Sequence, residues 1–114
     1  MREVYDMKMY EILVPSLSKD WMGSCLDRLS QHVRIKRYVA SRPHMRLYSR
    51  GTLAEYTPFD IREAADMVRM GLYDGIIVSS PSVMERLDSW ERVRRYLSEQ
   101  GIPVVYASHV VEEG

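Results

Sequence analysis

The residues best suited to chemistry in this 114-residue chain are serines that directly follow short apolar runs. One group follows the run at residues 10–14, and a second follows the run at residues 74–78. Serine hydroxyls and the free N–H groups at a helix start together favour an anion such as phosphate. The candidate ligand- or anion-binding residues are Ser18, Ser79, Ser80 and Ser82. Serine is also a preferred helix cap, so capping alone is the alternative.

Ser16 is the candidate catalytic residue, a nucleophile. A serine hydroxyl needs an adjacent base to become reactive, and His109 follows the last apolar run of the chain. The alternative for His109 is a surface histidine without a role. His32 and His44 lack the spacing of metal ligands, so we expect no metal site. The loops lack a Gly-rich phosphate cradle, and no motif predicts a cofactor.

The first half of the chain has an apolar pattern that alternates between strand and helix. Residues 10–14 predict a buried strand, and apolar side chains at helical spacing predict a helix over residues 18–32. Those on its apolar face are Trp21, Met22, Cys25, Leu26 and Leu29. Residues 33–40 predict a second strand and residues 41–44 a turn. Residues 45–48 form either a returning hairpin strand or a loop.

The second half begins with a clear helix start. Thr57 suits the N-cap, Pro58 the first helical position, and Asp60 the positive end of the helix dipole. Gly71 suits the left-handed residue that ends this helix. The apolar residues 74–78 predict another buried strand.

The last predicted helix extends from about residue 82 to residue 100. Ser82 and Glu85 have the spacing of a capping box at its start, and Gly101 ends it. Residues 102–106 predict the final strand. Helices between buried β-branched strands predict a parallel sheet with right-handed crossovers. The fold class is therefore α/β, a small three-layer domain with a four-stranded, mostly parallel sheet. We expect a polar leader over residues 1–8 and one domain over residues 9–114.

The charges are unevenly distributed along the chain. Lys plus Arg and Asp plus Glu each number 16, which excludes a uniformly basic nucleic-acid binder. Residues 28–54, however, contain no acidic residue. A basic segment with interleaved tyrosines is typical of phosphate-backbone binding. The candidate nucleic-acid-binding residues are Arg34, Lys36, Arg37, Arg42, Arg46 and Arg50, with Arg28 at the start of the segment. The alternatives are an edge strand protected by cations, or contact with the acidic part of another copy in a homo-oligomer.

The amino-acid composition also indicates in which cellular compartment the protein is expected. The single cysteine, Cys25, excludes an intrachain disulfide, and we expect it in the core. No apolar run approaches the roughly 20 residues of a membrane span, and the first residues lack the apolar part of a signal peptide. We therefore expect a cytoplasmic protein without a membrane partner. The absence of Asn and the excess of Arg over Lys fit a thermophile or a GC-rich genome.

Several segments of the chain follow a known pattern. They are Leu13-Val14-Pro15-Ser16, Met70-Gly71-Leu72-Tyr73-Asp74, Gly75-Ile76-Ile77-Val78, Asp88-Ser89-Trp90 and Gln100-Gly101-Ile102-Pro103-Val104-Val105. In these segments the chain loosely resembles the catalytic domain of the serine recombinases, the resolvases and invertases. The resemblance implies a resolvase-like variant of the α/β fold, a flavodoxin-like one being the alternative. It also implies that Ser16 stands at the position of the family's nucleophile.

The chain departs from that family at its catalytic arginines. Val14 stands where the family has an arginine, and Pro81, Ser82 and Glu85 stand where it has an Asp-Arg pair and a further arginine. Such arginines stabilise the phosphate transition state. We therefore expect a resolvase-like module, nucleic-acid-associated or self-associating, without catalytic activity. One alternative is a small enzyme or sensor domain that binds a phosphorylated ligand at the strand ends. The other is a structural subunit of an oligomer.

Overall fold

A computed structural model describes residues 6–108 of the chain, which are organised around four short strands. They are β1 (Met7–Glu11), β2 (Met45–Tyr48), β3 (Gly75–Val78) and β4 (Val104–Tyr106). Each neighbouring pair is parallel, and the strand order is β2-β1-β3-β4. The carboxyl ends of all four strands therefore lie at the same edge of the sheet.

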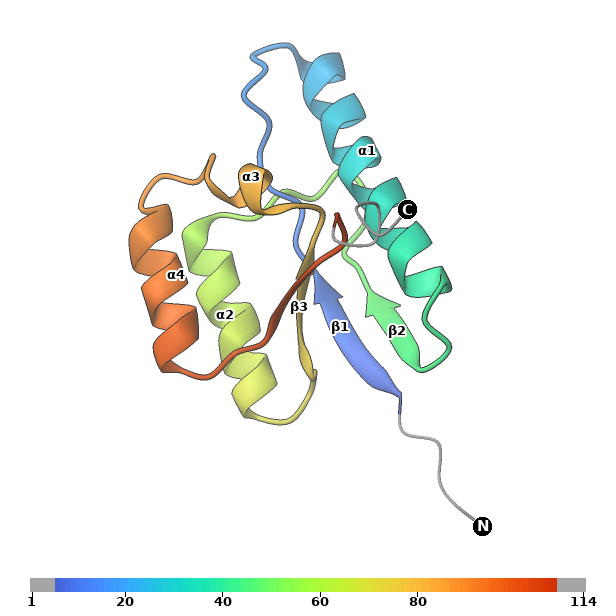
Figure 1. Cartoon of the computed structure of the whole chain (residues 1–114). Coiled ribbons are helices and arrows are strands. Elements are labelled where there is room, and N and C mark those ends of the chain that lie inside the picture. Colours follow the sequence, from blue (N-terminus) through green and yellow to red (C-terminus); the bar gives the residue numbers. More distant parts are fainter. Residues whose placement is uncertain (1–5, 109–114) are drawn as a thin grey trace.

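Helices cover both faces of this sheet. They are α1 (Trp21–Ala40), α2 (Pro58–Arg69), α3 (Pro81–Met84) and α4 (Trp90–Glu99). Figure 1 shows α1 on one face, with α2 and α4 side by side on the other. Within residues 6–108, none of these helices combines the length and the apolar character needed to cross a membrane. The predicted α/β fold with a four-stranded sheet is confirmed, and the sheet is entirely parallel.

The start and end of α2 follow the predicted local signals. Thr57 is the N-cap, and its hydroxyl accepts a hydrogen bond from the Asp60 amide at 3.3 Å. The Asp60 carboxylate in turn accepts one from the Thr57 amide at 2.9 Å, which completes a capping box. After α2, Gly71 has a φ of 85°, the left-handed conformation that favours glycine.

The strand predicted at residues 33–40 is wrong, because these residues form the second half of α1. The alternation of β-branched and basic side chains there also fits a helix, in which Ile35 points inward and its basic neighbours point outward. The chain turns after Ser41, as Pro43 does not suit a continuing helix. The strand lies instead at residues 45–48, where β2 pairs in parallel with β1 and is not a hairpin return.

The single helix predicted over residues 82–100 is also wrong, because two helices occupy this range. Ser89, with a φ of 68°, separates α3 from α4. The predicted capping box at Ser82 and Glu85 is absent, since Ser80 is the N-cap of α3 and Glu85 its C-cap. At the other end of the described chain, β1 starts at Met7, inside the expected leader and upstream of the predicted strand.

The orientation of α1 differs from that of an ordinary amphipathic helix. Its buried residues are Arg28, Gln31 and Ile35. Its exposed large apolar residues are Trp21, Met22, Leu26, Leu29 and Val33. Cys25 is half-buried and outside the core, contrary to the sequence-based expectation. The apolar face predicted from spacing is therefore real, but it points away from the sheet.

Candidate functional site

A crevice opens where the chain connections leave β1 and β3 in opposite directions. From β1 the chain passes through α1 to β2, and β3 pairs with the other side of β1. In parallel sheets this switch of direction places a ligand crevice beyond the carboxyl ends of the two strands. A polar cleft of about 350 Å³ lies here, between α1 and the segment that follows β3. It is lined by Asp27, Ser30, Gln31, Arg34, Ser79, Ser80, Ser82, Val83 and Arg86.

Three of the predicted serines converge in this cleft. Ser79 is only 3 % exposed, and its hydroxyl forms no hydrogen bond with any residue that the structure describes. The Ser80 and Ser82 hydroxyls lie 3.0 Å apart. Although Ser80 stands at the start of α3, its side chain makes no capping hydrogen bond. The capping alternative therefore does not explain these hydroxyls, and they are available to a ligand.

Two arginines give the cleft a positive charge. Arg34 is exposed on α1 and forms no ion pair within residues 6–108. Arg86 follows α3, and its Nη1 donates to Asp27 Oδ2 at 2.8 Å. The lining thus contains two guanidinium groups and one carboxylate. The planar guanidinium matches the oxygens of a phosphate or carboxylate in a two-pronged arrangement.

Asp27 holds Arg86 in position and stays ionised. Burial opposes ionisation of Asp27, but hydrogen bonds from Arg86 and Gln31 outweigh it and lower the pKa of the carboxyl below its ordinary value. Gln31 Nε2 donates to Asp27 Oδ2 at 2.9 Å and to the Val14 carbonyl at the same distance. Gln31 thereby connects Asp27 in the cleft to Val14, which lies in the segment directly after β1. The lining of the cleft contains hydroxyl, amide and guanidinium groups, which can donate hydrogen bonds to an anion.

The remaining serine candidates lie in the turn before α1. The Ser16 hydroxyl accepts a hydrogen bond from the Ser18 amide at 2.9 Å, and the Ser18 hydroxyl accepts one from the Asp20 amide at 3.2 Å. Asp20 is the actual N-cap, since its carboxylate accepts from the Gly23 amide. Neither serine lines the polar cleft. A nucleophilic role for Ser16 stays a prediction, and His109 lies outside the described residues.

The basic segment divides between a buried and an exposed part. Arg28 is 5 % exposed and pairs with Glu55 at 2.5 Å, so it serves the fold. Arg34, Lys36 and Arg37 are exposed along the second half of α1. Within residues 6–108, none of these three forms an ion pair with a carboxylate.

The other predicted nucleic-acid-binding residues lie around β2, and each has a partner. The Arg42 guanidinium stacks 4.4 Å from the centre of the Tyr38 ring, and that of Arg50 lies 4.0 Å from the centre of the Tyr56 ring. Arg46 lies 3.7 Å from Asp6 in an exposed ion pair. The basic segment therefore does not form one uniform row, and its unpaired cations belong to α1.

A second polar cluster, not predicted from the sequence, lies at the carboxyl end of β1. Glu11 is only 1 % exposed, its Oε2 lies 2.6 Å from His32 Nδ1, and its Oε1 accepts a hydrogen bond from the Ser49 hydroxyl. The sequence contains one signal for this cluster, because Glu11 is a charged residue inside an apolar run. Arg86 is a further residue of the cleft that was not predicted from the sequence. Its proximity to Ser79 depends on α3 turning the chain back towards α1.

Comparison with known proteins yields no relative for this chain. No protein family, curated protein or solved structure matches it. The resemblance to the serine recombinases stays a prediction that these comparisons neither support nor contradict.

Proposed function

We propose that this protein binds a small phosphorylated ligand in the polar cleft at the carboxyl ends of β1 and β3. The observation that carries this proposal is the convergence of three serines with Arg34 and Arg86. These groups come from two segments about fifty residues apart in the sequence. They meet at the place where a parallel sheet of this order receives ligands.

The chemistry of the lining favours a phosphate over a neutral ligand. Hydroxyl and guanidinium groups donate hydrogen bonds, and a phosphate accepts several of them at once. Ser79 supports this, because the residue is only 3 % exposed and its hydroxyl has no hydrogen-bond partner among the described residues. A volume of about 350 Å³ suits a small metabolite, since it lies near the lower end of the range for ligand sites.

Thermal unfolding of the full chain with a ligand panel tests this proposal. The panel contains inorganic phosphate, sugar phosphates and nucleoside monophosphates, each with its unphosphorylated counterpart. A ligand at a hundred times its Kd stabilises the folded state by about 2.7 kcal/mol, which raises the Tm by several degrees. We expect at least one phosphorylated compound to do so and its counterpart to have no effect. No shift across the whole panel contradicts the proposal.

Matched variants locate the binding site. Arg34→Ala removes an unpaired guanidinium from the lining, and Ser79→Ala removes the unpartnered hydroxyl. We expect Arg34→Ala to weaken binding by about ten- to a hundredfold, because a hydrogen bond to a charged group is worth about 1.5–3 kcal/mol. Lys36→Ala is the control, since Lys36 is an exposed cation of the same helix that does not line the cleft. Equal weakening by Lys36→Ala would indicate general charge attraction.

Nucleic-acid binding is the second candidate function. It is supported by the three exposed cations of α1 that have no acidic partner among the described residues, Arg34, Lys36 and Arg37. Binding through such cations weakens steeply with salt because counterions are released. We expect the triple change of these residues to Ala to abolish low-salt binding of a DNA or RNA oligomer. In contrast to the cleft, this surface requires Lys36, so Lys36→Ala separates the two functions.

A further inference from the structure

The exposed apolar face of α1 forms a narrow stripe. Met22, Leu26, Leu29 and Val33 are each between 38 and 60 % exposed. At about 100° per residue, these four positions fall within roughly 60° of the helix circumference, opposite the buried Arg28, Gln31 and Ile35. A contiguous apolar surface of this kind on a soluble domain marks an interaction site. We call these four residues the α1 stripe.

The spacing of the α1 stripe is the same in both directions. The intervals are four, three and four residues. A second α1 that runs antiparallel therefore sets Met22 opposite Val33 and Leu26 opposite Leu29, and the same contacts recur on the other side of a two-fold axis. Such self-complementarity is the property of an isologous interface, in which one surface pairs with its own copy.

The charges on α1 favour the same antiparallel arrangement. The cations of the second half, Lys36 and Arg37, come to lie near the N-terminal end of the other helix, where Asp20 and the exposed ring of Trp21 are found beside a single cation, Lys19. An ion pair and a cation–π contact are both available there. A parallel arrangement would superpose the cations of the two copies. The antiparallel one separates them by about 25 Å or more along the helix axis, which exceeds the screening length of about 8 Å at physiological salt.

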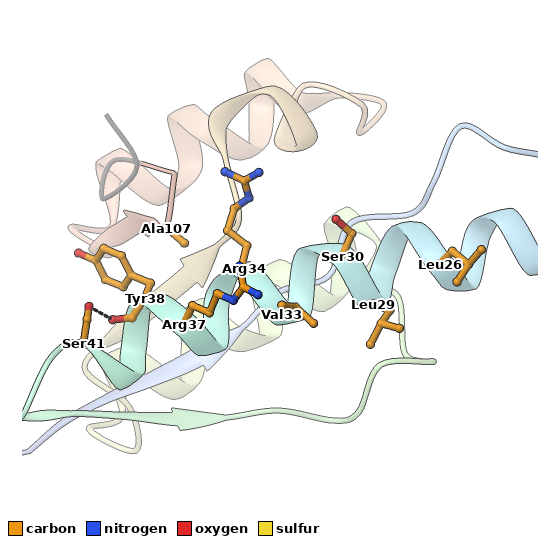
Figure 2. A pocket seen from close by; sticks show the side chains of 9 residues that line it. All are labelled: Leu26, Leu29, Ser30, Val33, Arg34, Arg37, Tyr38, Ser41 and Ala107. Atoms are coloured by element: carbon orange, nitrogen blue, oxygen red, sulfur yellow. Dashed lines mark hydrogen bonds between the residues drawn. The ribbon is translucent and has the colours of Figure 1, made fainter. Parts of the chain in front are cut away.

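A groove beside the α1 stripe provides room for the other copy. It has a volume of about 590 Å³ and lies between α1 and Ala107 at the end of β4. Figure 2 shows Leu26, Leu29 and Val33 along the helix, with Arg37 beside them and Ala107 across the groove. The groove extends along the second half of α1 as far as Ser41. In the antiparallel arrangement this half faces the start of the other α1, where Trp21 begins the helix and the exposed Leu17 lies in the turn before it.

From this geometry we propose that two copies of the chain form a homodimer through an antiparallel pair of α1 helices. The α1 stripe is its centre, and the groove receives the apolar side chains that precede the partner's stripe. Leu26 and Leu29 do not line the polar cleft. Ser30 and Arg34 line both the groove and the cleft, so the dimer is tested with changes at Leu26 and Leu29, which belong to the groove alone.

Sedimentation equilibrium of the full chain tests the dimer over a range of micromolar concentrations. We expect a dimer that the double variant Leu26→Asp/Leu29→Asp converts to a monomer. Both leucines are solvent-exposed in the single chain, so this variant is expected to stay folded, and circular dichroism checks that it does. Leu72→Asp is the matched control, because Leu72 is equally exposed but lies after α2. A wild-type monomer at every concentration, or a dimer that survives the double change, overturns the proposal.

Cross-linking tests the antiparallel orientation. In a Cys25→Ser background, chains with Met22→Cys are mixed with chains carrying Val33→Cys and treated with a thiol cross-linker of about 8–10 Å, the distance between packed helices. We expect cross-links between the two kinds of chain. Cross-links confined to pairs of Met22→Cys chains indicate parallel helices and overturn the proposal. A chain that ends at Ser108 and dimerises while the full chain does not shows that residues 109–114 cover the stripe, which also overturns it.

Discussion

The carboxylate of Glu11 lies within 2.6 Å of the His32 ring nitrogen Nδ1 and is almost completely shielded from water. The same carboxylate also accepts a hydrogen bond from the Ser49 hydroxyl. This contact joins β1, α1 and the loop after β2 at one point. It explains why a histidine and other polar residues occupy the inward face of α1, since the carboxyl edge of the sheet presents polar groups that must be paired.

Loss of His32 is expected to cost more stability than neutralisation of Glu11. His32→Ala leaves the buried carboxylate with a single hydrogen bond, and we expect a loss of about 2–3 kcal/mol. Glu11→Gln removes the charge that needs compensation, and we expect about 1 kcal/mol. Urea unfolding at neutral pH measures both values. A larger loss for Glu11→Gln than for His32→Ala would contradict this account.

Gln31 is expected to be essential for the packing of α1. Its side-chain amide donates to the Val14 carbonyl at 2.9 Å and accepts from the Val14 amide at 3.0 Å, in a buried environment. Gln31→Leu leaves both backbone groups without these partners, and we expect a loss of about 2–4 kcal/mol in urea unfolding. Lys36→Leu on the exposed side of the same helix should stay within about 0.5 kcal/mol. Similar losses for the two variants would show that the amide contacts do not matter.

The capping box of α2 is expected to make stability sensitive to acid. The hydrogen bond from the Thr57 backbone lowers the pKa of Asp60 below its ordinary value of 3.8, and burial opposes this only in part. Since the pKa is lower in the folded state, Asp60 contributes its full stabilisation above about pH 4 and loses it as the pH falls through the folded value.

Two variants separate this contribution from other acidic groups. Thr57→Ala is expected to cost about 1 kcal/mol at neutral pH, as for other N-cap replacements. With Asp60→Asn, the difference in unfolding free energy from the wild type should be constant above about pH 4 and shrink as the pH falls below it. Urea unfolding at a series of pH values provides the measurement. A difference that stays constant well below about pH 4 would exclude the ionised Asp60 as its source.

Gly75 is expected to tolerate no larger residue, because β3 begins in close contact with its neighbours. A Cβ atom added there would lie 3.0 Å from the Met9 side chain and 3.0 Å from the Pro103 carbonyl oxygen. We expect Gly75→Ala to lower the free energy of unfolding by about 1–3 kcal/mol, as for other overpacked sites. Trimming the flexible neighbour, in Gly75→Ala/Met9→Val, should not restore full stability, because the Pro103 carbonyl belongs to the backbone. Complete restoration would show that Met9 alone causes the conflict.

Local signals predicted the elements whose boundaries depend on neighbouring residues. The cap at Thr57 and the left-handed Gly71 delimit α2 as expected, and the apolar runs at residues 74–78 and 102–106 contain β3 and β4. Ser79, Ser80 and Ser82 lie at the carboxyl edge of the sheet because they directly follow β3, whereas Ser16 and Ser18 do not line the cleft. Each of these features depends on backbone conformation or on periodicity within a few residues.

The tertiary structure determined which face of α1 packs against the sheet. The sequence by itself determined that Trp21, Met22, Leu26 and Leu29 share a helix face, but not which face meets the sheet. The answer depends on partners distant in sequence: Glu11 binds His32, Val14 binds Gln31, and Glu55 binds Arg28. Buried polar groups at the edge of the sheet require hydrogen bonds, and the polar side of α1 supplies them. The apolar side of α1 is therefore left exposed on the surface. This exposed side is the interface that we propose for the dimer.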